Sequence, residues 1–263
     1  MEAPINKGYY IIGIIILFAT SYGQYLISSN FIMNLLIVYG VPILVASIFW
    51  GRTILKKSIH NMFVALKFGL GAYGAFTVLG TLISFGIIFF LASFDPSALN
   101  LLHRLNPVLN IPPGAAWVMV AGSFLIIGPS EEYIFRGFVY GGLLSIFKNR
   151  HWFSLAFISS IMFAAVHLYY GLTYGIASLI AFTDLITFGM AMAVTYYLSG
   201  GNLLIPALIH GAYDATGFLG VATSQGLGAI LRYSLLLIGI IVALVIFVKR
   251  IRKRSESLRL IET

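Results

Sequence analysis

Apolar runs long enough to cross a bilayer recur along the whole of this 263-residue chain. An α-helix rises about 1.5 Å per residue, so about 20 apolar residues span the hydrocarbon of a membrane. No water is present there to bond backbone N–H and C=O groups, so a spanning segment must be a helix or part of a closed barrel. A barrel requires short segments of alternating polarity, whereas these runs are continuous. The sequence therefore predicts an all-α polytopic membrane helix bundle.

The composition agrees with this prediction. Hydrophobic residues make up 60% of the chain and charged residues 9%, whereas about a quarter of the residues of a soluble domain are charged. No sequence repeat is apparent, so we expect one integral membrane domain, 1–263, with a motif-bearing core at about 115–222. Eight spans are expected, at about 8–28, 31–50, 63–92, 115–147, 152–171, 175–198, 203–222 and 228–249.

The net charge of +8 is gathered at the ends of spans rather than on one face. This pattern indicates contact with anionic lipid and not with nucleic acid. Placing the three basic clusters at span ends in the cytoplasm requires an even number of spans in a multi-pass cell-membrane protein, with both termini cytoplasmic. These groups are Arg52, Lys56 and Lys57 after the second span, Lys148 and Arg150 after the fourth, and Lys249, Arg250, Arg252, Lys253 and Arg254 after the eighth.

Two adjacent acids, Glu131 and Glu132, lie inside the fourth apolar run and are followed by Arg136. Ionised groups in hydrocarbon are costly and usually face a polar cavity. Glu132 and Arg136 are four residues apart and share a helix face, which favours an ion pair. Glu131 points away from Arg136 and is left to face an intramembrane polar cavity. The alternative is a structural ion pair beside a spare, protonated glutamate.

A proline immediately precedes the two acids, in Gly128-Pro129-Ser130. Proline inside a helix removes a backbone donor and clashes with the preceding turn. We therefore expect a kink here or the start of a fresh half-helix. The positive end of the dipole of such a half-helix would lie near the carboxylates.

Three more ionisable groups in apolar spans form two further motifs. Phe163 and His167 are four residues apart in the fifth span, and His210 and Asp214 are four apart in the seventh. The latter spacing places both groups on one helix face, where they can serve one site or the carboxylate can orient the imidazole. The structural alternatives are a hydrogen-bonded packing role for His167 and a helix-face hydrogen bond between His210 and Asp214.

Together these spans offer a carboxylate base, two imidazoles and a further acid. Such a set can activate water for attack on an amide carbonyl and stabilise the oxyanion that develops. It can also bind a divalent metal such as zinc, with Glu131, His167, His210 and Asp214 as candidate ligands. The sequence does not separate these two mechanisms. Absence of cysteine excludes disulfides and thiolate chemistry.

The order of these motifs resembles that of a known family, the CAAX-protease and bacteriocin-processing family, also called the Abi family. It includes the type II CAAX prenyl endopeptidases. The resemblance covers about residues 128–215 and rests on three motifs on separate spans: Glu131-Glu132-x-x-x-Arg136, Phe163-x-x-x-His167 and His210-x-x-x-Asp214.

The resemblance implies an eight-helix membrane endopeptidase in which Glu131 activates the water and His167 assists it. It also implies that His210 and the residue four later complete the site or its oxyanion pocket, with Glu132, Arg136 and Phe163 in support. The prenyl endopeptidases have asparagine at that last position, where this chain has Asp214. An ionised carboxylate donates no hydrogen bond, so Asp214 must be protonated, bind a metal or orient His210.

The sequence thus predicts an intramembrane endopeptidase whose partners are membrane lipid and a peptide or lipidated-protein substrate. Removal of the C-terminal tripeptide of prenylated CAAX-type proteins, or processing of another membrane-associated peptide, is the expected reaction. One alternative is a proton- or ion-coupled transporter that uses Glu131, Asp184 and Asp214 as a relay. Another is a non-catalytic membrane protein of the bacteriocin-immunity type.

Overall fold

The computed structural model describes residues 5–27, 33, 36–98, 113–168, 175, 178–223 and 225–259. These residues form eight helical rods and no strand, as the sequence predicts. The rods are α1 (Lys7–Ile27); the π-helical turn η1 (Leu36–Gly40) with α3 (Val41–Lys57); α4 (Met62–Ala92); a composite rod of α5 (Pro113–Gly122), η4 (Ser123–Ile127), α6 (Gly128–Glu132), η5 (Tyr133–Tyr140) and α7 (Gly141–Ile146); α8 (Trp152–Ala165); α10 (Ser178–Leu198); α11 (Leu204–Ala222); and α12 (Gln225–Arg259).

Five of the rods are long and apolar enough to cross a membrane: Leu36–Lys57, Met62–Ala92, Gly114–Ile146, Ser178–Leu198 and Gly226–Arg252. The apolar parts of α1 and α8 are shorter. The rod α11 is not in this group of five, because His210 and Asp214 lower its mean hydropathy. The chain is therefore an integral membrane protein, and one of its less apolar helices carries a predicted site motif.

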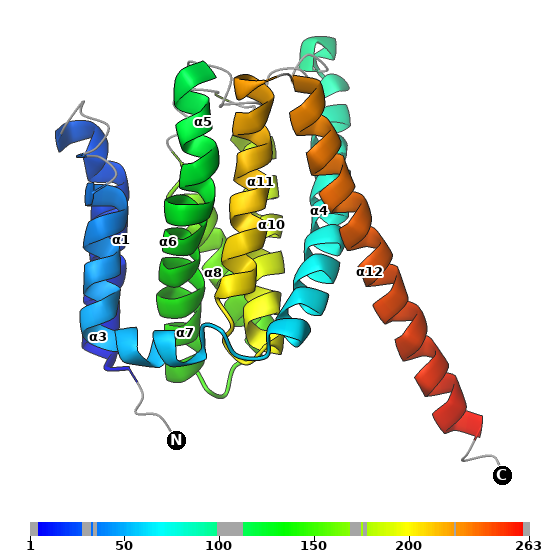
Figure 1. The fold of residues 1–263 in the computed structure, drawn as a ribbon, viewed down its shortest axis with the longest axis horizontal. Helices are drawn as coiled ribbons and strands as arrows, with labels where there is room; N and C mark the ends of the chain where they lie inside the picture. The colour runs from blue at the N-terminus through cyan, green and yellow to red at the C-terminus, as the bar shows by residue number, and fades with distance from the viewer. Residues whose placement is uncertain are drawn as a thin grey trace.

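One end of the bundle collects the basic groups. The link between α3 and α4 lies against the link between α10 and α11, where the Leu203 N–H donates to the Ser58 carbonyl (2.9 Å). Beside it, the side-chain amide of Asn202 donates to the carbonyl of His60 (2.6 Å). Helix α1 begins and α12 ends at this same end (Figure 1). The positive-inside rule predicts that this end is cytoplasmic.

Helix α10 forms the centre of the bundle and packs between α4 and α8. All its residues from Thr187 to Thr195 are buried. A helix that is apolar on all sides is expected in such a position, because it leaves no polar face for water. By contrast, α12 leans away from the other helices (Figure 1) and exposes most of its apolar surface.

The rod that carries Glu131 and Glu132 continues through Pro129, so no fresh half-helix begins there. Ile127 and Gly128 both keep right-handed helical backbone angles. The N–H of Gly128 donates to the carbonyl of Ser123, five residues earlier, which is the bond of a π-helix. This wider turn accommodates the missing donor of Pro129 without ending the helix. A second π-helical stretch, η5, follows directly after Glu132.

Helices α4 and α12 cross at a pair of glycines. A Cβ on Gly74 would lie 2.2 Å from the carbonyl carbon of Gly239, and one on Gly239 would lie 2.8 Å from the carbonyl oxygen of Leu70. Small residues let helix backbones approach closely in a membrane, where van der Waals packing holds helices together. This crossing therefore fixes α12 to the bundle.

We expect Gly74→Ala to destabilise the protein, because the new methyl group forces α4 and α12 apart. Overpacking of this kind costs roughly 1–3 kcal/mol. The matched control is Gly86→Ala on the same helix, where a Cβ meets nothing within 4 Å. Thermal unfolding in detergent should show a lower Tm for Gly74→Ala and an unchanged or higher Tm for Gly86→Ala. Equal Tm values for the two variants would contradict the proposed crossing.

Candidate active site

The composite rod buries a glutamate–arginine ion pair in the bilayer region of the bundle. Arg136 Nε lies 3.1 Å from Glu132 Oε2, and the two side chains are 1% and 0% exposed. The guanidinium also donates through Nη2 to the Gly189 carbonyl of α10 (3.2 Å) and lies over the Phe163 ring of α8, 4.8 Å from its centroid. The predicted pair on one helix face is present and connects three rods.

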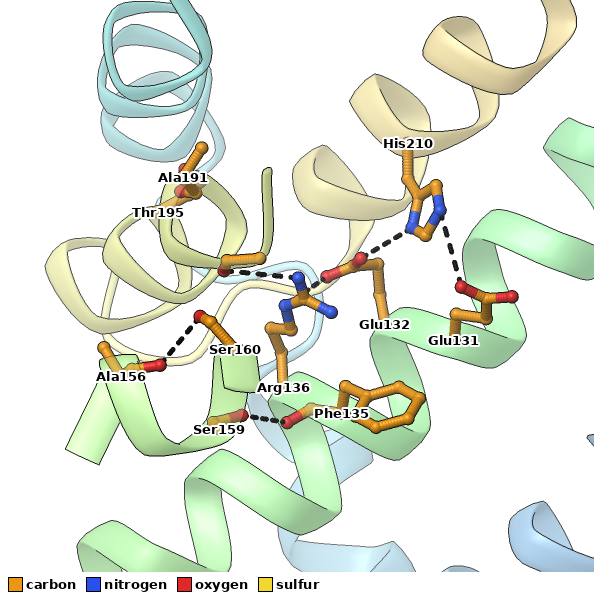
Figure 2. Close-up of polar contacts among 11 residues, drawn as sticks. Glu131, Glu132, Phe135, Arg136, Ala156, Ser159, Ser160, Ala191, Thr195 and His210 are labelled. Carbon is orange, nitrogen blue, oxygen red and sulfur yellow. Dashed lines mark hydrogen bonds and ion pairs between the residues drawn. The ribbon is translucent and has the colours of Figure 1, made fainter. Parts of the chain in front are cut away.

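The second oxygen of Glu132 is bonded to His210 of α11. His210 Nδ1 lies 2.7 Å from Glu132 Oε1, and both groups are buried (Figure 2). A carboxylate only accepts hydrogen bonds, so Nδ1 carries the proton and donates it. Glu132 thus holds Arg136 with one oxygen and orients His210 with the other. Spacing within one helix predicts the pair of Glu132 with Arg136 but says nothing about a partner on another helix.

The other ring nitrogen of His210 faces two carboxylates. Its Nε2 lies 3.5 Å from Glu131 Oε2 and 3.6 Å from Asp214 Oδ2. The side chain of Asp214 is 24% exposed, against 10% for Glu131, so the site is more open beside Asp214. Tyr39 of η1 donates its hydroxyl to Glu131 Oε1 (2.9 Å). The structure thus brings together Glu131, His210 and Asp214 around one imidazole edge.

His167 lies just after the end of α8. Its Nδ1 lies 2.8 Å from the carbonyl of Phe163. A carbonyl accepts and does not donate, so this contact assigns the proton to Nδ1 and makes Nε2 the basic nitrogen of the neutral ring. The Phe163 ring packs edge-on against His167 (5.1 Å between centroids) and against His210 (6.0 Å). Phe163 therefore connects the two imidazoles.

Two glycines let α11 approach the composite rod closely at this point. A Cβ on Gly128 would lie 2.6 Å from the carbonyl oxygen of Ala207, and one on Gly211 would lie 2.8 Å from that of Ser123. Gly128 immediately precedes the segment with the two acids, and Gly211 follows His210. The short His210–Glu132 hydrogen bond depends on this contact between backbones.

Three contributors to the site were not predicted. Tyr39 bonds Glu131, Phe188 packs against His210 (4.8 Å between ring centroids), and the backbone of Gly189 binds Arg136. A tyrosine in an apolar run is common near membrane interfaces, and a carbonyl carries no sequence signal. None of the three could have been identified from spacing.

Asp184 lies apart from the group around His210. Its Oδ1 accepts a hydrogen bond from Ser84 of α4 (3.3 Å). Asp184 lines a neighbouring cavity, one wall of which is Phe188, the residue that packs against His210. The contacts given by the described residues therefore do not form the relay of Glu131, Asp184 and Asp214 that a transporter would use.

The candidate metal ligands predicted from the sequence are Glu131, His167, His210 and Asp214. Among the described residues, no group of three or more histidine, aspartate or glutamate side chains is placed to hold one metal ion. The hydrogen bonds at Nδ1 of His210 and of His167 leave Nε2 of each ring as the nitrogen that could bind an ion. In this arrangement the donors of the described residues do not form a metal site.

The fold and the site define a polytopic membrane protein with a buried carboxylate–histidine centre. The family model described as type II CAAX prenyl endopeptidase Rce1-like matches residues 113–216. That stretch runs from α5 into α11 and contains all three motifs. This match over residues 113–216 confirms the predicted resemblance to the family of the type II CAAX prenyl endopeptidases. Neither curated proteins nor solved structures give a match to the chain.

We expect Glu132→Ala to destabilise the fold strongly, because Arg136 is left as a buried charge without its carboxylate. Breaking a buried pair in this way costs about 3–5 kcal/mol. The control is Glu131→Gln, one residue away, whose amide oxygen can still accept from Tyr39 and which should shift Tm little. Thermal unfolding in detergent measures both variants. A Tm for Glu132→Ala close to that of Glu131→Gln would contradict a structural role for Glu132.

Proposed function

We propose that the protein is an intramembrane endopeptidase that hydrolyses a peptide bond with a water molecule activated by Glu131. This proposal rests on the different surroundings of the two adjacent acids. Glu132 is engaged by Arg136 and His210, whereas Glu131 lies at the edge of the site beside Nε2 of the same imidazole. The match to a family of endopeptidases supports the reaction class.

In the proposed reaction Glu131 accepts a proton from water, and the hydroxide attacks the scissile carbonyl carbon. The oxyanion that forms accepts a hydrogen bond from Nε2–H of His210, whose positive charge is supported by Glu132 at Nδ1. When the tetrahedral intermediate collapses, Glu131 returns its proton to the leaving amine. His167 assists through its basic Nε2, held near His210 by Phe163.

Asp214 occupies the position at which the prenyl endopeptidases have asparagine. Glu132 already orients His210 with a 2.7 Å hydrogen bond, whereas Asp214 lies 3.6 Å from Nε2. We therefore assign Asp214 the role of a second carboxylate that favours the imidazolium form of His210. In a site of low dielectric constant this attraction is stronger than in water.

The substrate we propose is a membrane-associated peptide or lipidated protein, with removal of the C-terminal tripeptide of a prenylated CAAX-type protein as the specific reaction. The family description supports this substrate class. An apolar anchor would keep the scissile bond within the bilayer, where the site is buried. We propose that substrate enters from the end of the bundle that carries the basic groups.

We expect Glu131→Gln to abolish cleavage of a prenylated peptide with a tripeptide tail, and His167→Ala to reduce it at least about a hundredfold. Matched controls are Asp95→Asn and His60→Ala, which make comparable changes at exposed positions outside the site. Cleavage is measured by mass spectrometry. Only variants whose Tm equals that of the unsubstituted protein are compared. Full turnover by Glu131→Gln would rule out the assigned base.

Addition of a strong divalent-metal chelator should leave cleavage unchanged, because no three donor groups of the described residues are arranged to hold one ion. The protein is incubated with chelator, exchanged into metal-free detergent and assayed with the same peptide. Loss of cleavage that zinc restores would show instead that the site rearranges to bind a metal.

A further inference from the structure

Arg232 lies within the apolar span Gly226–Arg252 of α12, far along the chain from the basic residues Lys249, Arg250 and Arg252 at the end of that span. It is half-buried, and no carboxylate of the described residues lies within ion-pair distance of it. Charged side chains in membrane spans are rare and mark functional sites unless they are paired. Arg232 is therefore a cation that the proposed reaction does not use.

The guanidinium of Arg232 is held in a fixed orientation by α11. Its Nε donates to Thr216 Oγ1 (3.1 Å), its Nη2 donates to the Tyr213 carbonyl (3.4 Å), and it lies 4.6 Å from the centroid of the Tyr213 ring. Tyr213 and Thr216 flank Asp214 on the helix that also carries His210. Arginine has five N–H donors in a planar fork. The Nη1 group makes no hydrogen bond with a described residue, which leaves one edge of the fork for a ligand.

Arg232 lines a cavity of about 160 Å³ that is rich in hydroxyl groups. On its walls, Tyr73 has a buried hydroxyl with no hydrogen-bond partner among the described residues. Asp184 supplies an acceptor from α10. Phe188 forms a wall shared with the active site, because it also packs against His210. The polar residues that line the cavity are Tyr73, Thr77, Thr81, Asp184, Thr187, Tyr213, Arg232 and Tyr233.

We propose that this cavity binds the free C-terminal carboxylate of the peptide substrate, with Arg232 as the anion-binding group. This inference rests on the proposed endopeptidase function. A guanidinium fork binds a carboxylate with two parallel hydrogen bonds. The hydroxyl of Tyr73 adds a neutral donor, and Asp184 accepts from the peptide N–H groups that precede the carboxylate. The cavity would thereby select a cleavage position by its distance from the chain end.

The spacing along α11 agrees with a short C-terminal fragment. Thr216, which anchors Arg232, lies six residues after His210, or about 9 Å along the helix. An extended peptide advances about 3.3 Å per residue, so three residues beyond the scissile bond cover about 10 Å. The separation of His210 and Thr216 along the helix axis is therefore close to the length of an extended tripeptide.

The test uses the full-length protein in neutral detergent and one prenylated peptide with a three-residue tail, made as the free acid and as the carboxamide. We measure kcat/KM for the active protein and Kd for the Glu131→Gln variant. Each measurement is repeated after Arg232→Gln is added. The acid should be preferred over the amide about ten- to a hundredfold. Arg232→Gln should remove this preference by weakening the acid alone, and Lys67→Gln, on exposed α4 surface, should retain it.

Each outcome decides between the proposals. If Arg232→Gln lowers the kcat/KM and the affinity of the acid and the amide peptides equally, or changes neither peptide, the carboxylate site is excluded. If no peptide is cleaved but the Kd on Glu131→Gln still depends on the carboxylate and on Arg232, the endopeptidase proposal fails and the binding site stands. If anionic phospholipid raises the Tm only when Arg232 is present, and acid and amide bind alike, the ligand is a lipid phosphate and the inference is overturned.

Discussion

The buried carboxylate of Glu132 joins three helical rods through an ion pair with Arg136 and a hydrogen bond with His210. One oxygen faces Arg136, which in turn binds the backbone of α10, and the other accepts from His210 of α11. Each of these groups would be costly alone in a low-dielectric interior, and together they neutralise one another. The position of His210, and therefore of everything that meets its Nε2, follows from this one carboxylate. Glu131 is left available for chemistry because its neighbour satisfies the structural need.

The local backbone around the two acids is shaped by the same requirement. The π-helical turns η4 and η5 flank Glu131 and Glu132 and carry the helix past Pro129 without a break. π-Helical turns are rare in proteins, and those that occur are frequently found at functional sites. Gly128 and Gly211 then allow the backbones of the composite rod and α11 to meet. Without this approach the side chain of Glu132 would not reach both of its partners.

The two polar regions of the bundle share the wall formed by Phe188, yet they differ in kind. Around His210, three acids lie 2.7–3.6 Å from the ring nitrogens of the imidazole. Around Arg232 they are hydroxyls, one acid and one cation that line a cavity. The first arrangement suits proton transfer and the second suits recognition of an anion. Both are anchored on α11, the helix in which His210 and Asp214 lower the mean hydropathy.

The amino-acid sequence by itself determined the helical membrane fold, because continuous apolar runs in hydrocarbon permit no other backbone arrangement. It also determined the pair of Glu132 with Arg136, since spacing of four residues lies within one helix. The contacts that only the tertiary structure decided each join two different helices. They are His210 with Glu132, Tyr39 with Glu131, and Arg232 with α11. Helical periodicity fixes the face on which a side chain lies, whereas the depth and rotation of neighbouring helices are set by packing contacts such as those at Gly128 and Gly211.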